Sequence, residues 1–300
     1  MPLPKDKLAR VIVNTDAKNE ADDQYCIVQA LLSPSFELAG LIPAHFGTRR
    51  NTRSMEESRE EIDLLLKLMN LTGKVTVANG APTALPDDKT PVPSEGAELI
   101  IREAMKDDDR PLHVAFLGPL TDMASALLME PKIASRNVRV VWIGGGRWPV
   151  GGSEFNLSND IHAANVVFRS SVELWQLPMT IYQMIAVSYA ELEERVRPHG
   201  PLGAYLVDQL IEFNSQFHAG PIEYRSLGDT PSLSVIMNPN GGTWRYEPAP
   251  EFSPLMNYIH TGRNRPVRVY DTIDVRFILE DMFAKIARHA RGVQETAVFL

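Results

Sequence analysis

Short apolar runs alternate with longer segments of helical hydrophobic period through most of this 300-residue chain. The alternation is typical of parallel β-strands that are joined by crossover helices. A chain of this length is long enough for one large α/β domain or two modest ones. The pattern therefore predicts an α/β fold with a mostly parallel, Rossmann-like sheet flanked by helices.

The predicted elements follow this alternation along the chain. The strands are the runs rich in Val, Ile or Leu, at residues 11–14, 38–42, 75–78, 113–117, 138–143 and 179–182. The helices lie between them, at residues 23–32, 54–69, 94–105, 120–128 and 160–169. The helix at 54–69 places Ile62, Leu65, Leu66 and Met69 on one face, as expected of an amphipathic helix that covers a sheet.

The pattern changes beyond residue 185, where helices are predicted at 191–196, 202–217 and 275–291. The segment 238–254 is rich in Pro, Gly and aromatic residues, and it is interpreted either as a lid over a site or as a subunit contact. No linker separates this part from the rest of the chain. We therefore expect a single domain, 1–300, with a helical and loop-rich C-terminal part that packs over the sheet edge.

Charge and cysteine content narrow the possible partners. The chain has 38 Asp and Glu against 30 Lys and Arg, a net charge of −8, which disfavours nucleic acid. No run approaches the ~20 apolar residues of a membrane span, and residues 1–10 lack the apolar core of a signal peptide. The single cysteine, Cys26, lies in an apolar run and is expected to be a buried structural thiol. These features predict a cytoplasmic protein.

An acidic turn follows the first predicted strand. Asp16, Glu20, Asp22 and Asp23 place four carboxylates within eight residues, where the ligands of open α/β sheets bind. Such a cluster would be repulsive unless a hard cation neutralises it, and Ca²⁺ or Mg²⁺ is the natural candidate. In the alternative interpretation, Asp22 and Asp23 cap the following helix and Asp16 is solvated.

Two further polar segments lie later in the chain, the first of them after the strand predicted at 138–143. Glu154 and Asn156 would point the same way from an extended segment and hydrogen-bond a polyhydroxylated ligand, whereas Asp160 is expected to cap a helix. The preceding glycine run at 144–146 matches neither phosphate-loop pattern. Asp229 precedes Pro231, which suits the first turn of a short helix, so Asp229 is either a helix cap or part of the same site.

Together these segments resemble the nucleoside hydrolases, which are calcium-dependent N-ribosyl hydrolases, and above all a divergent branch with NExDDQ and GDTPS motifs. The resemblance covers residues 9–237 and rests on four motifs in the family's order. They are the double Asp after Asp16, the GPLTD at 118–122 where the family has GPLTN, the Glu154-Phe155-Asn156 motif with Asp160, and Asp229 in its GDTPS context. The resemblance implies the nucleoside hydrolase fold.

The resemblance also implies roles for individual residues. Ca²⁺ would be held by Asp16, Asp23, Asp229 and the backbone carbonyl of Leu117. The sugar would be bound by Asp22 at its 2-hydroxyl, by Asn156 at its 2- and 3-hydroxyls and by Glu154 at its 5-hydroxyl. A Ca²⁺-bound water, deprotonated by Asp16, would then attack the anomeric carbon of a ribonucleoside or a close analogue. The resemblance further implies a homodimer or a homotetramer.

Three positions depart from the classical members of the family. The longer spacing after Asp16 allows Glu20 to replace Asp22 as the sugar contact. Gly228 stands where those members have a candidate acid, a His, for the leaving base. The replacement candidates are His45, His218, Tyr224 and Arg225, with His45 and Tyr224 ranked first because they are expected to face the crevice. Trp148 either stacks on the base or packs on protein.

These departures leave two alternatives beside a nucleoside hydrolase. One is a hydrolase of a different or modified glycoside on the same fold. The other is a catalytically silent protein that binds a metal and a sugar. The sequence does not choose among bases or sugars.

Overall fold

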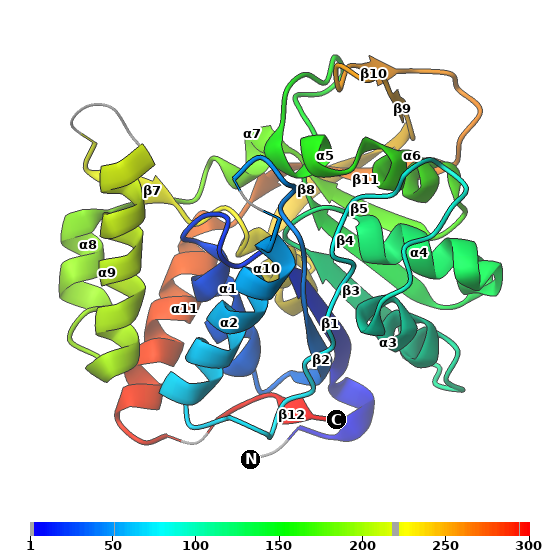
Figure 1. Cartoon of the computed structure of the whole chain (residues 1–300). Helices are drawn as coiled ribbons and strands as arrows, with labels where there is room; N and C mark the ends of the chain where they lie inside the picture. Colours follow the sequence, from blue (N-terminus) through cyan, green and yellow to red (C-terminus); the bar gives the residue numbers. More distant parts are fainter. Residues whose placement is uncertain (1–2, 51, 218–221, 294) are drawn as a thin grey trace.

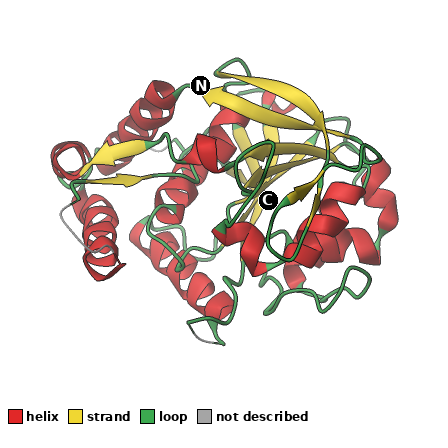
Figure 2. Ribbon diagram, turned by 90° about the horizontal axis from the view of Figure 1, so that it is seen from above, coloured by secondary structure: helices red, strands yellow, loops and turns green. Residues whose placement is uncertain are grey.

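The computed structural model describes residues 3–50, 52–217, 222–293 and 295–300. Its centre is an eight-stranded sheet in the order β12-β2-β1-β3-β4-β5-β11-β8. Neighbouring strands pair in parallel, except that β8 runs antiparallel to β11. Helices flank the sheet on both sides (Figure 1, Figure 2), which confirms the predicted α/β fold.

The elements have the following bounds. The main sheet contains β1 (Ala9–Thr15), β2 (Phe36–Pro43), β3 (Leu112–Phe116), β4 (Val138–Ile143), β5 (Glu173–Leu177), β8 (Gly242–Pro248), β11 (Pro266–Ile273) and β12 (Val298–Phe299). Two small antiparallel sheets pair β6 (Ala186–Ser188) with β7 (Tyr224–Ser226) and β9 (Glu251–Phe252) with β10 (Tyr258–Ile259). The α-helices are α1 (Asp23–Leu31), α2 (Ser54–Leu68), α3 (Glu95–Ala104), α4 (Thr121–Met129), α5 (Phe155–Asn159), α6 (Ile161–Arg169), α7 (Met179–Tyr182), α8 (Tyr189–Arg195), α9 (Gly200–Phe217), α10 (Pro231–Met237) and α11 (Val275–Ala290). Two 3₁₀ helices span Lys5–Lys7 and Pro131–Ser135.

The period of two along the strands divides the core between the two faces of the sheet. On β1, Val11 and Val13 pack with helices α1, α2 and α11, whereas Ile12 packs with α3, α4 and α6. Figure 1 shows these two groups of helices on opposite sides of the strands. Both faces are therefore buried, as a parallel sheet requires. Among the described residues, the helices are too short or too polar to cross a lipid bilayer.

Most of the predicted helices are confirmed, but two predicted strands are wrong. Residues 75–78 form only an isolated bridge, in which Val77 pairs with Leu41. Residues 179–182 form helix α7, and the strand lies just before them as β5. The buried polar residue Gln176 interrupts the apolar run of β5, and this hides the strand from a search for apolar runs.

The C-terminal part contributes more to the sheet than the sequence suggests. Strands β8, β11 and β12 all join it, so this part does not merely pack over the sheet edge. The segment 238–254, predicted as a lid or a subunit contact, contains β8, the edge strand of the sheet. Alternating polar and aromatic residues on β8 suit an edge strand with an exposed face.

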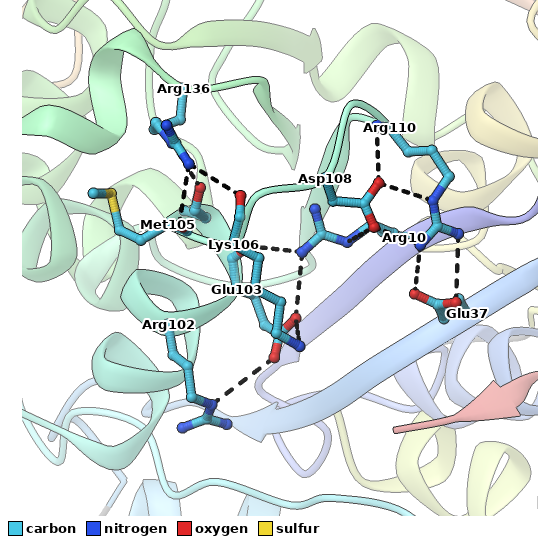
Figure 3. Close-up of polar contacts among 10 residues, drawn as sticks. Arg10, Glu37, Arg102, Glu103, Met105, Lys106, Asp108, Arg110 and Arg136 are labelled. Carbon is cyan, nitrogen blue, oxygen red and sulfur yellow. Dashed lines mark hydrogen bonds and ion pairs between the residues drawn. The ribbon is translucent and has the colours of Figure 1, made fainter. Parts of the chain in front are cut away.

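A buried network of ion pairs lies at the opposite end of β1 from the acidic turn (Figure 3). Arg10 donates through Nη2 to the backbone oxygen of Glu103 at 2.7 Å and to its carboxylate at 3.3 Å. Arg110 pairs with Glu37 of β2 at 2.8 Å and with Asp108 at 2.6 Å. The network connects β1, β2 and α3 by pairing the buried charges of Arg10, Glu37 and Glu103.

Candidate active site

A cavity of about 540 Å³ opens at the carboxyl ends of the parallel strands. It is lined by Asp16, Asn19, Glu20, Asp22, Asp23, Leu117, Ile143, Glu154, Phe155, Asn156, Tyr182, Gln183, Ile222, Tyr224, Arg225, Ser226, Gly228 and Asp229. The crossovers after β1, β3 and β4 and the segment before α10 thus meet in one hollow. None of the described residues of 238–254 lines it, so that segment is not a lid over this cavity.

Four buried aspartates form the floor of the cavity. Asp16 follows β1, Asp22 and Asp23 begin α1, and Asp229 precedes α10. Carboxylate oxygens of Asp22, Asp23 and Asp229 all lie within 4.8 Å of one another. The fold therefore brings together aspartates that are far apart in sequence, and the predicted metal-binding carboxylates all face one cavity.

Hydrogen bonds hold these carboxylates in different ways. The hydroxyl of Thr15 donates to Asp23 Oδ1 at 2.5 Å, and the backbone N–H of Gly228 donates to Asp22 Oδ2 at 2.8 Å. By contrast, Asp16 Oδ2 is buried without a hydrogen-bond partner among the described residues. A Cβ atom on Gly118 would lie 2.7 Å from the Asp16 carboxyl, so a glycine is needed beside it.

Burial raises the pKa of all four aspartates. The pKa of Asp23 rises to about 8 and that of Asp22 to about 6, chiefly through loss of solvation and then through the neighbouring carboxylates. The pKa values of Asp16 and Asp229 are also well above the ordinary range for the same reasons. Arg225 opposes the shift at Asp22. A cation among these aspartates would stabilise their carboxylate form.

The donor set fits a hard divalent cation. Carboxylate and carbonyl oxygens are the ligands that Ca²⁺ prefers, and Asp16 Oδ2 supplies a buried oxygen that protein donors leave unpaired. The carbonyl of Leu117 also lies at the cavity, where it accepts a hydrogen bond from Asn156 Nδ2 at 2.6 Å. The metal site inferred from the resemblance is therefore compatible with the residues present.

Glu154 and Asn156 reach the cavity by a different local structure from the one expected. They do not lie on an extended segment: Glu154 is the N-cap of α5, and Asn156 lies in its first turn. The Glu154 carboxylate accepts the backbone N–H of Leu157 at 2.8 Å and of Gly145 at 2.9 Å, and the Tyr182 hydroxyl at 3.1 Å. Burial raises its pKa despite these donors. Both side chains still face the cavity.

Asp160 is a helix cap, as the sequence predicts. Its Oδ1 accepts the backbone N–H of Ala163 at 2.8 Å at the start of α6.

Cys26 is buried, and its thiol lies 3.4 Å from the backbone oxygen of Asp229. Burial raises the pKa of this thiol, as expected of a buried structural cysteine.

Glu20, Tyr224 and Arg225 lie on the wall of the cavity above the aspartates. Glu20 forms an ion pair with Arg225, so its carboxylate is turned toward β7. Asp22 lies deeper and is 7% exposed. Tyr224 is 54% exposed and lies at the mouth. Both candidates for the sugar contact, Glu20 and Asp22, therefore line the same cavity.

His45 and Trp148 are not brought to the cavity. His45 accepts the backbone N–H of Gly47 at Nδ1, at 3.1 Å, and its Nε2 lies 2.8 Å from the Thr121 hydroxyl. Trp148 donates through Nε1 to Gln176 Oε1 at 3.0 Å and packs on protein. His218, the other histidine proposed from the sequence, lies outside the described residues.

The buried histidine predicts a pH dependence of stability. Burial lowers the pKa of His45 to about 4, below the ~6.5 of an unfolded chain. The unfolded state therefore binds more protons between these values, and stability contributed by neutral His45 falls as the pH drops. Between pH 7.5 and pH 5, the loss should be about 2 kcal/mol. Urea unfolding at both pH values measures it.

The matched variant for this prediction is His45→Gln. Its amide can accept from Gly47 and donate to Thr121 without titrating. The gap in unfolding free energy between the unmodified chain and this variant should therefore change by about 2 kcal/mol over that range. Parallel pH profiles for the two proteins would show that His45 does not titrate as its burial implies.

Sequence reasoning missed several residues of the cavity. Tyr182 contacts Glu154, and Gln183 and Ile222 complete the wall. None belongs to a recognisable motif, and Tyr182 was assigned to a strand that is in fact α7. Their place in the cavity depends on the tertiary structure, which brings α7 and β7 to the same cavity as the aspartates.

Known proteins share both the sequence pattern and the fold. Residues 11–275 match the family described as inosine-uridine preferring nucleoside hydrolase. The pyrimidine-specific ribonucleoside hydrolase RihA of Escherichia coli O1:K1 is 24% identical over 222 residues, which cover 66% of this chain and 69% of that protein. RihA of Salmonella typhimurium is 24% identical over 227 residues, which cover 69% of this chain and 72% of that protein.

Among solved structures, the purine-preferring ribonucleoside hydrolase from Gardnerella vaginalis has the same fold. The TM-score is 0.79 at 20% sequence identity, and the superposition covers 94% of this chain and 99% of that one. The sequence match includes the acidic turn after β1, the start of α5 and Asp229. Because it also spans most of the chain, this protein belongs to the inosine-uridine preferring nucleoside hydrolase family of N-glycosyl hydrolases.

Proposed function

We propose that this protein hydrolyses the N-glycosidic bond of ribonucleosides or close analogues, in a reaction that depends on Ca²⁺. The observation that carries the proposal is the unpartnered, buried Asp16 Oδ2 among three further buried aspartates. Membership of a family of N-glycosyl hydrolases supplies the reaction class. The cavity of about 540 Å³ has the size of a small-molecule site.

Asp16, Asp23, Asp229 and the Leu117 carbonyl would hold the cation. When bound, Ca²⁺ would lower the pKa of a water molecule and bind two hydroxyls of the sugar. The protein contributes the arrangement of the oxygens: Thr15 orients Asp23, and Gly118 leaves room for the Asp16 carboxyl.

Asp16 is the proposed general base. Its carboxylate lies at the end of β1 with one oxygen free of protein donors, so that oxygen can accept the proton of the attacking water. Burial places this exchange away from bulk solvent. As the bond to the base breaks, positive charge develops on the sugar, and the surrounding carboxylates stabilise it more than they stabilise the neutral substrate.

Asp22, Asn156 and Glu154 are the proposed sugar contacts. Asn156 is held by two carbonyl groups, Leu117 at 2.6 Å and Ile143 at 2.9 Å, so its amide oxygen has a fixed direction. Glu154 is held by three backbone N–H groups, which fixes its carboxylate in the same way. Groups that are already ordered bind a polyhydroxylated sugar at a lower entropic cost.

Removing the cation tests the proposal. We expect uridine, inosine or another nucleoside of a purine and pyrimidine panel to release free base and reducing sugar in Ca²⁺, and not after chelation. Ca²⁺ at 100 times its dissociation constant should also stabilise the folded protein by about 3 kcal/mol. The midpoint temperature of thermal unfolding should rise accordingly. Both readouts use the same purified protein.

The alternatives give different outcomes. Calcium-dependent stabilisation with release from a modified glycoside alone would indicate a different substrate on the same site. Calcium-dependent stabilisation with no release from any glycoside would indicate a silent binding protein. Activity that survives chelation would contradict the cation requirement.

A further inference from the structure

The wall of the cavity formed around β7 differs in chemistry from its floor. The floor consists of carboxylates, which suit the hydroxyls of a sugar. The wall has an apolar, an aromatic and a cationic side chain: Ile222, Tyr224 and Arg225. Because the floor is matched to the sugar, the heteroaromatic base of a nucleoside is left to lie against this wall.

Arg225 is the one cationic side chain among the described residues that line the cavity. It forms an ion pair with Glu20, and its Nη1 lies 3.4 Å from Asn214 Oδ1. Its guanidinium carbon lies 5.1 Å from the centre of the Phe213 ring, within the range of a cation–π contact. Only 11% of the side chain is exposed. The guanidinium is therefore held in place before any substrate binds.

The described residues of this cavity include no histidine that could protonate a departing base. Gly228 precedes Asp229, and a Cβ atom there would lie only 3.3 Å from Asp22 Oδ2 and from the Tyr182 ring. The Tyr182 hydroxyl is engaged by Glu154, and His45 lies outside the cavity. Among the described residues, the polar groups left to interact with the departing base are Tyr224 and Arg225 of the wall around β7.

We propose that Arg225 is a catalytic residue that contacts the departing base and stabilises its negative charge, with Glu20 as its positioning residue. The inference rests on the proposed function. A guanidinium does not lose its proton at working pH, so Arg225 acts through charge and hydrogen bonds and not as a proton donor. Without such a cation, the anionic base would form beside the carboxylates of the floor and would be repelled by their negative charge.

The bond between the anomeric carbon and the base nitrogen breaks, and its electron pair stays on the base. The water oxygen bonds to the anomeric carbon, and Asp16 takes the water's proton. The anionic base remains beside Arg225 until it leaves the cavity and takes a proton from solvent.

The test compares leaving groups. We expect R225Q to lower kcat/KM for uridine and inosine by about 100-fold, the effect of removing one preorganised donor to a developing anion. The loss for p-nitrophenyl β-D-ribofuranoside should be at least about tenfold smaller, because p-nitrophenolate is a stable anion that needs less assistance. R225K keeps the charge without the planar fork and should lie between. E20Q should show the same leaving-group dependence with a smaller loss.

The matched control is R50Q. Arg50 also lies over the Phe213 ring, at 5.9 Å, but it lines a neighbouring hollow instead of the catalytic cavity. Any effect of R50Q should be equal for the three substrates. Thermal unfolding of each variant in Ca²⁺ reports whether it is folded, and R225K and E20Q carry the comparison if R225Q is not.

Equal losses by R225Q on all three substrates would overturn the inference, since Arg225 would then act on the sugar or on the fold. A leaving-group dependence found for Y224F and not for R225Q would also overturn it. If the unmodified protein releases nothing from these three or from any nucleoside of the panel, the proposed function fails and the inference fails with it. Release by the unmodified protein, with equal losses for R225Q, removes the inference alone.

Discussion

Asp16→Asn should lower kcat by about 10²–10⁴-fold at saturating nucleoside, because a general base contributes that much to a proton-transfer step. The asparagine side chain has nearly the same shape, so the variant should fold and the cavity should keep its form. Its amide oxygen can still face the cation, but it cannot take the proton of the attacking water. Steady-state release of base from the best substrate of the panel measures the loss.

The control for this prediction is Asp63→Asn. Asp63 lies on α2, is half exposed and pairs with Arg59 one helical turn earlier. Its neutralisation changes the net charge by the same amount outside the cavity, and kcat should stay within about twofold, since surface pairs contribute little. Asp16→Asn with near-normal kcat and unchanged Ca²⁺ requirement would show that another group is the base.

Arg10→Met should destabilise the fold by about 3 kcal/mol, because breaking the buried ion pair leaves the Glu103 carboxylate with only the more exposed partners Lys106 and Arg102. Arg10 is 3% exposed on β1, and it contacts both the backbone oxygen and the carboxylate of Glu103. The methionine fills much of the arginine's volume, so the loss reports the missing contacts more than a cavity. The midpoint of urea unfolding at pH 7.5 measures it.

Arg102→Met provides the comparison within the same network (Figure 3). Arg102 lies 3.9 Å from the same Glu103 carboxylate, but its side chain is 59% exposed. The unfolding free energy should change by less than about 0.5 kcal/mol, as for other surface pairs. Similar losses for the two variants would mean that the network acts through the charge of Glu103 and not through the burial of Arg10.

The fold class was predictable because it depends on periodicity, which the sequence displays directly. The helix predicted at 54–69 has a clear apolar stripe, and α2 spans Ser54–Leu68. One of the two errors occurs where a buried polar residue breaks the pattern: Gln176 on β5 donates to the Gly144 carbonyl and accepts from Trp148, contacts that only the tertiary structure provides. A search for apolar runs cannot recognise such a strand.

The candidate site was predictable to the extent that strand ends converge. The acidic turn follows strand β1 of the parallel sheet, where a site is expected, whereas Asp229 was singled out by the family resemblance. The β7 wall was not predictable in the same way, because β7 lies outside the main sheet and pairs only with β6. The extended segment expected at Glu154 and Asn156 was wrong for a local reason, since α5 begins at this motif, although both side chains line the cavity.

The separation of the aspartates along the chain has a consequence for the order of folding. Asp22 accepts its hydrogen bond from Gly228, 206 residues later in the sequence. Contacts of such high sequence separation form late, after the entropy of closing the intervening loops has been lost. A chain emerging from the ribosome therefore carries its acidic turn in water, ionised and without its partners, until α10 has been synthesised. The proposed cation site is thus complete only once the segment around Gly228 has joined the fold.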